Sequence, residues 1–195
     1  MRYLLIIFLC ACTATRAPKQ EPTAQTAERV ELPREPLGPS IYDLPVQMVA
    51  ADGAKIGIDV ARGKYVVIAM FYASCSVACP LLVSEVNQLI DELPDDARKN
   101  VQVLLVSFDA ARDTPARLRT LAEERKFDAQ WTLAAAGDAD ARALAAVLGV
   151  KYRKLANGDF AHGSTIVALD RDGRPIARTD ALGQRAALVT ALSEP

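Results

Sequence analysis

Two cysteines at a spacing of four, Cys75 and Cys79, are the residues of this chain best suited to chemistry. They follow the apolar run Val66 to Tyr72, whose β-branched and aromatic residues predict a strand buried on both faces. Pro80 comes directly after Cys79 and suits the first turn of a helix, where its missing N–H would be unpaired anyway. The pattern therefore places both cysteines at a turn from a strand into a helix.

That position favours reactive sulfur. A helix N-terminus presents free N–H groups and positive partial charge, which favour thiolate over thiol. A spacing of about one helical turn puts both side chains on one face, close enough for a disulfide or for one shared metal ion. Ligands of open α/β sheets bind at the carboxyl ends of the strands, where this pair stands. The alternative is a pair of ordinary core cysteines, since free cysteine is often buried.

The N-terminus has the order of an export signal. Met1 and Arg2 precede an apolar stretch, Tyr3 to Ala11, that is much shorter than the about 20 residues needed to span a bilayer. Leu9-Cys10-Ala11-Cys12 resembles the lipobox of bacterial lipoproteins, which implies that Cys12 is lipidated and becomes the mature N-terminus. A plain secretory signal cleaved nearby, or a wrongly assigned start, is the alternative. We expect an exported protein anchored on the periplasmic side of the membrane.

The chain divides into a signal at 1–12, a tether at 13–40 and one domain at 41–195. The tether is polar, has no apolar period and carries five prolines, which predicts an extended, semi-rigid segment: Pro18, Pro22, Pro33, Pro36 and Pro39. Two cysteines then remain in the domain. A disulfide between them would close a very short loop and stabilise little, so it is better placed to be broken and remade. With a net charge of −1 and no basic stripe, the chain offers nucleic acid no electrostatic attraction.

Strands and helices alternate along the domain. The apolar runs and turn residues predict strands at Val46–Ala50, Lys55–Val60, Val66–Tyr72, Val101–Phe108, Trp131–Ala135, Phe160–Leu169 and Arg174–Arg178. Helices are expected at Leu81–Leu93, Ala116–Lys126, Ala139–Leu148 and Gln184–Leu192, with Asp113 or Thr114 and Asp138 as caps. The order predicts an α/β fold: a thioredoxin-like mixed sheet flanked by helices on both faces, with an N-terminal β-hairpin.

Four motifs in order resemble the SCO/SenC family, and the resemblance covers nearly all of Tyr42 to Leu192. They are F-Y-A-S-C-S-V-A-C-P, V-S-F-D-A-A-R-D-T-P, G-V-K-Y-R-K, and F-A-H-G-S before a strand ending in L-D-R-D-G-R-P. The resemblance implies a thioredoxin-like, membrane-tethered copper protein that helps to assemble the binuclear copper centre of cytochrome c oxidase. By motif position, its copper ligands fall on Cys75, Cys79 and His162.

That donor set suits copper. Thiolates select Cu(I) and imidazole also suits Cu(II), so two sulfurs and one nitrogen can hold one copper ion in either state. His162 is the single histidine of the chain, and a lone histidine is by default a surface or satisfied residue. Structural zinc is disfavoured because it wants four protein ligands. The expected partners of the monomer are the copper-bearing subunit of the oxidase, or another copper acceptor, and a thioredoxin-like reductant.

Asp109 stands where the family has an acidic residue near the copper motif. It is either an outer-shell or partner-contacting carboxylate or a loop cap. The chain departs from the family pattern at Ser76-Val77-Ala78, where Pro and Asp are common between the cysteines. It departs again at Ala110, where Pro is usual, and at Gly163, where Ser or Thr is common.

Two enzymatic readings compete with a metallochaperone. In a thiol-disulfide oxidoreductase, Cys75 and Cys79 would reduce a partner's disulfide without metal. Such reductases usually have a C-x-x-C motif and a facing cis-proline, whereas this spacing is longer and residues 160–170 contain no proline. A peroxidase of the peroxiredoxin kind would want Thr and Pro leading into one cysteine, but Tyr72 stands at the relevant spacing.

Overall fold

The computed structural model of the chain describes residues 36–74 and 78–193, and at Ala78 and Cys79 it describes the backbone alone. The expected export signal, the lipidation site at Cys12, most of the expected tether and Cys75 therefore lie outside the described residues. None of the helices in the described ranges combines the length and apolar composition that a membrane-spanning helix requires.

A seven-stranded mixed sheet forms the centre of the domain, in the order β2-β1-β5-β4-β3-β8-β9. The adjacent strands β3, β4 and β5 are parallel, and the other pairs in this sheet are antiparallel. A separate two-stranded sheet consists of β6 and β7. The strand bounds are β1 Gln47–Ala50, β2 Lys55–Gly57, β3 Tyr65–Phe71, β4 Val101–Ser107, β5 Trp131–Ala136, β6 Tyr152–Lys154, β7 Phe160–His162, β8 Ile166–Leu169 and β9 Pro175–Thr179.

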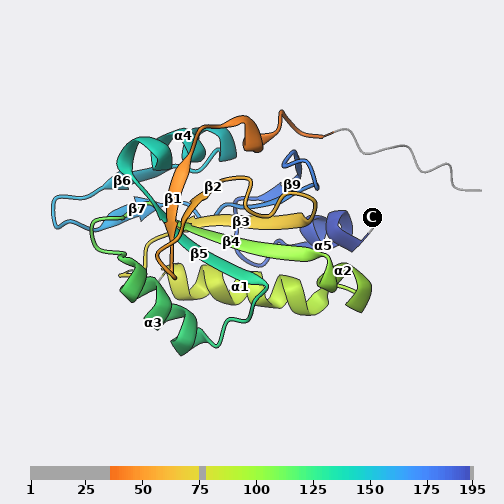
Figure 1. Cartoon of the computed structure of the whole chain (residues 1–195). Coiled ribbons are helices and arrows are strands. Elements are labelled where there is room, and N and C mark those ends of the chain that lie inside the picture. Colours follow the sequence, from red (N-terminus) through yellow and green to blue (C-terminus); the bar gives the residue numbers. More distant parts are fainter. Residues whose placement is uncertain (1–35, 75–77, 194–195) are drawn as a thin grey trace, which may run out of the picture. The chain divides into compact units, whose positions relative to one another are not determined.

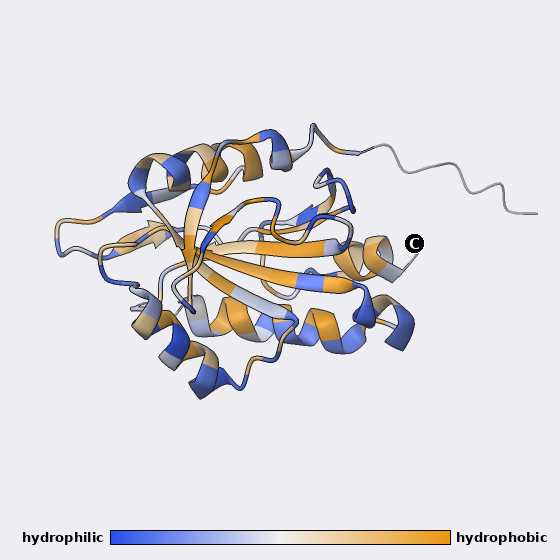
Figure 2. Ribbon diagram, viewed as in Figure 1, coloured by the Kyte–Doolittle hydropathy of each residue, from blue (hydrophilic) through white to orange (hydrophobic). Residues whose placement is uncertain are grey.

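Helices cover both faces of the large sheet, as predicted. Figure 1 shows α4 on one side of the sheet and α1 with α3 on the other. Figure 2 shows that β3 and β4, between these layers, are largely apolar along their length. The bounds are η1 Ile41–Asp43, α1 Ala78–Glu92, α2 Asp95–Lys99, α3 Pro115–Arg125, α4 Asp138–Leu148 and α5 Ala186–Ser193.

The central strands position the candidate site. All residues of β3 except Tyr65 are buried, because helices cover the strand on both faces. The parallel register pairs Phe71 at the end of β3 with Ser107 at the end of β4. The chain leading to Cys75 and the loop carrying Asp109 therefore leave the same edge of the sheet.

Several local predictions were wrong. The strand predicted at Phe160–Leu169 is two strands, because β7 pairs with β6 whereas β8 enters the large sheet beside β3. The strand predicted at Lys55–Val60 ends at Gly57. Asp138 is the first residue of α4 and not its cap, a position that Gly137 occupies. Of the two cap candidates for α3, Thr114 accepts the Arg117 N–H and Asp113 is used elsewhere.

The segment before η1 is bonded to the domain. The Leu37 N–H donates to the Pro175 carbonyl at 2.7 Å, and the Ser40 hydroxyl donates to the Asp172 carbonyl. Both partners lie in β9 or in the turn that leads into it. The start of the domain at residue 41 stays a prediction.

Candidate metal centre

The first turn of α1 contains the second predicted cysteine. The helix starts at Ala78, so Cys79 is its second residue and Pro80 its third, as the sequence predicted. N–H groups of a first turn have no partner within the helix, and their positive end favours a nearby thiolate. Tyr72, at the end of β3, is buried, and residues 73–74 form a turn before Cys75.

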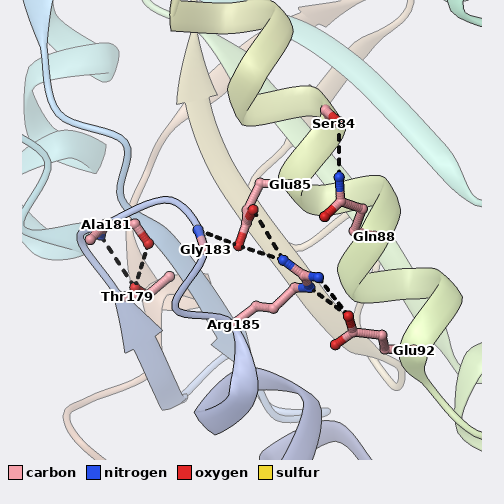
Figure 3. A network of polar contacts seen from close by, with 8 residues as sticks. All are labelled: Ser84, Glu85, Gln88, Glu92, Thr179, Ala181, Gly183 and Arg185. Carbon is pink, nitrogen blue, oxygen red and sulfur yellow. Dashed lines mark hydrogen bonds and ion pairs between the residues drawn. The ribbon is translucent and has the colours of Figure 1, made fainter.

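An ionic clasp fixes α1 against the segment that follows β9 (Figure 3). Glu85, which is buried, accepts the Gly183 N–H at 2.9 Å and the Arg185 guanidinium at 3.3 Å. Arg185 also donates at 2.6 Å to Glu92, which lies about two turns beyond Glu85 in the same helix. These hydrogen bonds raise the pKa of Arg185, with Glu92 the larger contributor. The helix that carries Cys79 is therefore held at its middle and its end.

His162 ends β7, and its ring meets the strand that leads to Cys75. The ring lies edge-on to Tyr72, with centroids 5.7 Å apart, and to Phe108, with centroids 5.4 Å apart. Its Nδ1 is 2.8 Å from the Gly163 carbonyl oxygen, which can only accept. This contact favours the tautomer with the proton on Nδ1, in which Nε2 carries the lone pair that binds metals.

An aromatic cluster surrounds this histidine. Phe108 stacks on Tyr152 at 4.6 Å and meets Phe160 edge-on at 5.0 Å, and Phe160 lies 5.3 Å from Tyr72. The cluster joins the ends of β3 and β4 to the β6–β7 hairpin. Its rings belong to Tyr72, Phe108, Tyr152, Phe160 and His162. Sequence reasoning missed this cluster, although its two phenylalanines, Phe108 and Phe160, stand in two of the motifs that carry the family resemblance.

The predicted ligand set extends beyond the described residues. Within them, no three His, Cys, Asp or Glu side chains lie close enough to share a metal ion. Cys75 and the Cys79 side chain were not part of that search, so the set of Cys75, Cys79 and His162 stays a prediction. The structure does bring the ring of His162 to Tyr72, three residues before Cys75.

Asp109 is buried at the carboxyl end of β4, where the sequence predicted it. Its carboxylate accepts from Arg112, which also reaches Asp159 of the hairpin turn at 3.4 Å. The hydrogen bond with Asp109 is the main cause of a raised pKa at Arg112. The Arg112 guanidinium lies over the Tyr72 ring at 5.5 Å. Asp109 thus acts through Arg112 to link the β4–α3 loop with the hairpin that carries His162.

A cavity of about 320 Å³ opens beside the aromatic cluster. Its walls include the aromatic side chains of Phe108, Tyr152 and Phe160. The rest of the lining is Ala111 and the charged residues Asp109, Asp138, Arg142, Arg153 and Lys154. Aromatic side chains beside charged ones are a composition often found where one protein contacts another.

A family model described as SCO1/SenC matches residues 35–194, which is most of the chain. The chain belongs to the SCO1/SenC family. The resemblance seen in the four sequence motifs is thereby confirmed.

One curated relative and several solved structures support this assignment to SCO1/SenC. A protein of Stutzerimonas stutzeri named "Putative copper-binding protein" is 28% identical over 121 residues, which are 62% of this chain and 57% of that relative. Arabidopsis thaliana ScoI with copper bound has a TM-score of 0.68 at 16% identity, covering 77% of this chain and 95% of that one. Bradyrhizobium japonicum ScoI with copper bound has a TM-score of 0.63 at 23% identity, covering 76% and 96%. These likenesses confirm the predicted fold.

The sequence also missed how this SCO1/SenC chain holds the turn before Cys75. The Ala73 N–H donates to Asp113 Oδ2 at 2.7 Å, and the Ala73 carbonyl accepts from Arg117 at 3.3 Å. Burial raises the pKa of the Asp113 carboxyl, whose Oδ1 has no hydrogen-bond partner in the described part of the chain. Asp113 resembled a cap in the sequence because Thr114-Pro115 starts the next helix.

Proposed function

We propose that this SCO1/SenC protein binds one copper ion through Cys75, Cys79 and His162 and delivers it to the binuclear copper site of cytochrome c oxidase. The observation that supports this most is the packing of the His162 ring on Tyr72, at the end of the strand that leads to Cys75. The curated relative is named for copper binding, and two of the similar structures hold copper.

Each proposed ligand has a chemical reason. Two thiolates favour Cu(I), and an imidazole nitrogen keeps the set competent for Cu(II). The first turn of α1 would stabilise a Cys79 thiolate, and the Nδ1 contact with the Gly163 carbonyl orients the imidazole. The copper ion is cargo, and delivery is the exchange of these ligands for those of the acceptor.

Asp109 is proposed as the outer-shell carboxylate of this centre. Its partner Arg112 lies over Tyr72 and Phe160, two rings of the aromatic cluster. Asp109 would therefore influence copper by holding Arg112 and the hairpin in place, without coordinating the ion. The cavity beside the cluster, with its aromatic and charged lining, would offer the acceptor a contact surface.

Export and anchoring complete the proposal. A signal at 1–12, a tether at 13–40 and lipidation of Cys12 would hold the domain at 41–195 on the periplasmic side of the membrane. A structure with a TM-score of 0.68 to this chain, at 21% identity and covering 81% of it and 94% of that chain, is a SCO1/SenC family lipoprotein of Bacillus anthracis.

Thiol-disulfide exchange is the second candidate function, favoured by the place of Cys79 in a helix first turn. One thiolate would attack an acceptor disulfide, and the other would resolve the mixed disulfide, so the acceptor gains two electrons and this pair becomes a disulfide. A thioredoxin-like reductant must then restore the dithiol. This activity would prepare an acceptor for copper.

Copper titration of the reduced full chain tests the proposal. We expect one Cu(I) per monomer, abolished in Cys75→Ala and Cys79→Ala and weakened at least about tenfold in His162→Ala. The matched control is Cys10→Ser with Cys12→Ser, which removes the two other cysteines and should leave the stoichiometry unchanged. Unweakened binding in His162→Ala would contradict the three-ligand centre. Absent copper binding with intact reduction of an acceptor disulfide would favour the second function.

A further inference from the structure

The turn between β3 and Cys75 is held from both sides by side chains distant in sequence. Ala73 lies two residues before Cys75. Its N–H donates to Asp113 Oδ2 at 2.7 Å, and its carbonyl accepts from Arg117 Nη2 at 3.3 Å. Both backbone polar groups of Ala73 are thus bound, one by Asp113 just before α3 and the other by Arg117 in its first turn. We propose that Asp113 and Arg117 are positioning residues that fix the backbone from which Cys75 is presented.

Asp113, one of the two residues that clamp Ala73, is itself held in place by further hydrogen bonds. Asp113 is fully buried, and the Ser107 hydroxyl donates to the same carboxylate oxygen that binds Ala73. The Asp113 N–H also donates to the Asp109 carbonyl at 2.9 Å. Ser107 is the residue of β4 that pairs with Phe71, so Asp113 is bonded to the strand beside the one from which the turn departs.

Helix capping does not explain why a carboxyl group is buried at this position. Thr114 already caps α3 by accepting the Arg117 N–H at 3.3 Å. Burial disfavours the charged form of Asp113 and raises its pKa, and one of its oxygens has no partner among the described residues. A buried polar group held at such a cost needs a role, and the hydrogen bond to Ala73 is the role that the contacts show.

The two cysteines depend on different supports. Cys79 belongs to α1, which the clasp of Glu85, Arg185 and Glu92 fixes to the domain. Cys75 follows Ala73 by two residues, so under this proposal the contacts at Ala73 set the direction in which the chain leaves towards Cys75. Removal of residues that hydrogen-bond to metal ligands and orient them typically changes metal affinity by about 10–100-fold.

The inference rests on the proposed function, and two readouts keep their failures apart. The first is Cu(I) affinity of the full chain, measured by competition with a chelator. The second is the midpoint potential of the metal-free Cys75–Cys79 couple against glutathione, in which the dithiol loses two electrons and two protons to form the disulfide. If wild type binds no copper through His162, the proposed function fails. The midpoint potential then tests by itself whether Asp113 and Arg117 position the turn.

Asp113→Ala should weaken Cu(I) binding about tenfold and shift the dithiol–disulfide equilibrium by a similar factor, which is about 30 mV. Asp113→Asn should stay near wild type, because its amide oxygen can still accept from Ala73 and Ser107. Arg117→Met should weaken binding about threefold through loss of one hydrogen bond. Thr114→Ala is the matched control, since it destabilises the same helix start without contacting Ala73.

Equal values for Asp113→Ala and Thr114→Ala in both readouts would overturn the inference. If Asp113→Ala does not fold, as judged by circular dichroism, Arg117→Met and Asp113→Asn decide. Wild-type affinity and potential in Arg117→Met, or a tenfold loss in Asp113→Asn, would then count against positioning.

Discussion

Two hairpins follow α4, and they are held in the domain by different means. In both, the turn contains a glycine with positive φ, Gly158 at 87° and Gly173 at 79°. Every residue of β8 is buried, and β8 pairs with β3 on one side and β9 on the other. Strands β6 and β7 pair only with each other among the described strands, and their residues are half-buried or exposed.

Side chains attach the β6–β7 hairpin to the rest of the domain. Its contacts are the aromatic cluster and the Arg112 bridge between Asp109 and Asp159. Ring and ion-pair contacts can shift by small amounts, whereas a strand inside a sheet is fixed by its hydrogen-bond register. The proposed ligand His162 therefore lies on the hairpin that side-chain contacts attach, an arrangement that would suit the proposed uptake and release of copper.

The turn glycines should differ most clearly in stability. A Cβ at Gly173 would lie 2.6 Å from Tyr42 ring atoms, whereas a Cβ at Gly158 meets nothing within 4 Å. Gly173→Ala combines backbone strain with overpacking of a buried ring, so we expect a loss of about 3 kcal/mol in the free energy of unfolding. Gly158→Ala should lose about 1 kcal/mol from backbone strain alone. Equal losses in urea unfolding would mean that both hairpins are packed alike.

Phe160→Ala should separate stability from copper binding. It removes ring contacts with Tyr72 and Phe108, worth about 1–2 kcal/mol together, and it frees the hairpin that presents His162. We expect a fall of several-fold in Cu(I) affinity, measured by chelator competition beside urea unfolding.

Ile176→Ala in β9 is the matched control, because Ile176 is likewise a partly buried apolar residue packed against the core. It should cost stability and leave copper affinity at the wild-type value. A parallel loss of affinity in both variants would show that copper binding follows global stability and not the position of the hairpin.

The sequence predicted the central layers of the fold well and the hairpins less well. β3 and β4 are largely apolar runs, and Thr114-Pro115 starts α3. Local sequence therefore specifies these elements. Residues 160–169 read as one strand because Phe160 at one end and Thr165, Ile166 and Val167 towards the other have high β propensity. Their division at Gly163 depends on which partner each part pairs with, and that choice is made by the whole fold.

The approach of His162 to Tyr72 could be expected only through the family resemblance. No local pattern specifies where the β6–β7 hairpin docks, since the rings that hold it come from three separate segments. The hydrogen bond from Ala73 to Asp113 joins residues 40 positions apart, so no local sequence pattern predicts it either. The thioredoxin-like sheet was therefore predictable from the residues, whereas the contacts around the candidate centre required the structure.

The smallest expected effect concerns a carboxylate of the β8–β9 hairpin. Hydrogen bonds from Arg178, and next from Thr165, lower the pKa of Asp180 below its usual value. Its charged form therefore stabilises the fold above the unfolded pKa of 3.8, and this contribution is lost as the pH falls through the lower folded value. Since Asp180 is largely exposed, Asp180→Asn should cost at most about 0.5 kcal/mol at pH 7.

Asp113→Asn should show the opposite pH dependence, because burial raises the pKa of Asp113. In wild type, the stability that the neutral Asp113 contributes is complete below 3.8 and is lost as the pH rises towards the raised folded value. Between pH 3 and pH 7, the free energy of unfolding of wild type in urea should therefore rise relative to that of Asp180→Asn. It should fall relative to that of Asp113→Asn. If both differences changed in the same direction with pH, Asp113 would be charged and paired in the folded protein, as Asp180 is. The two regions would then not differ in their electrostatics.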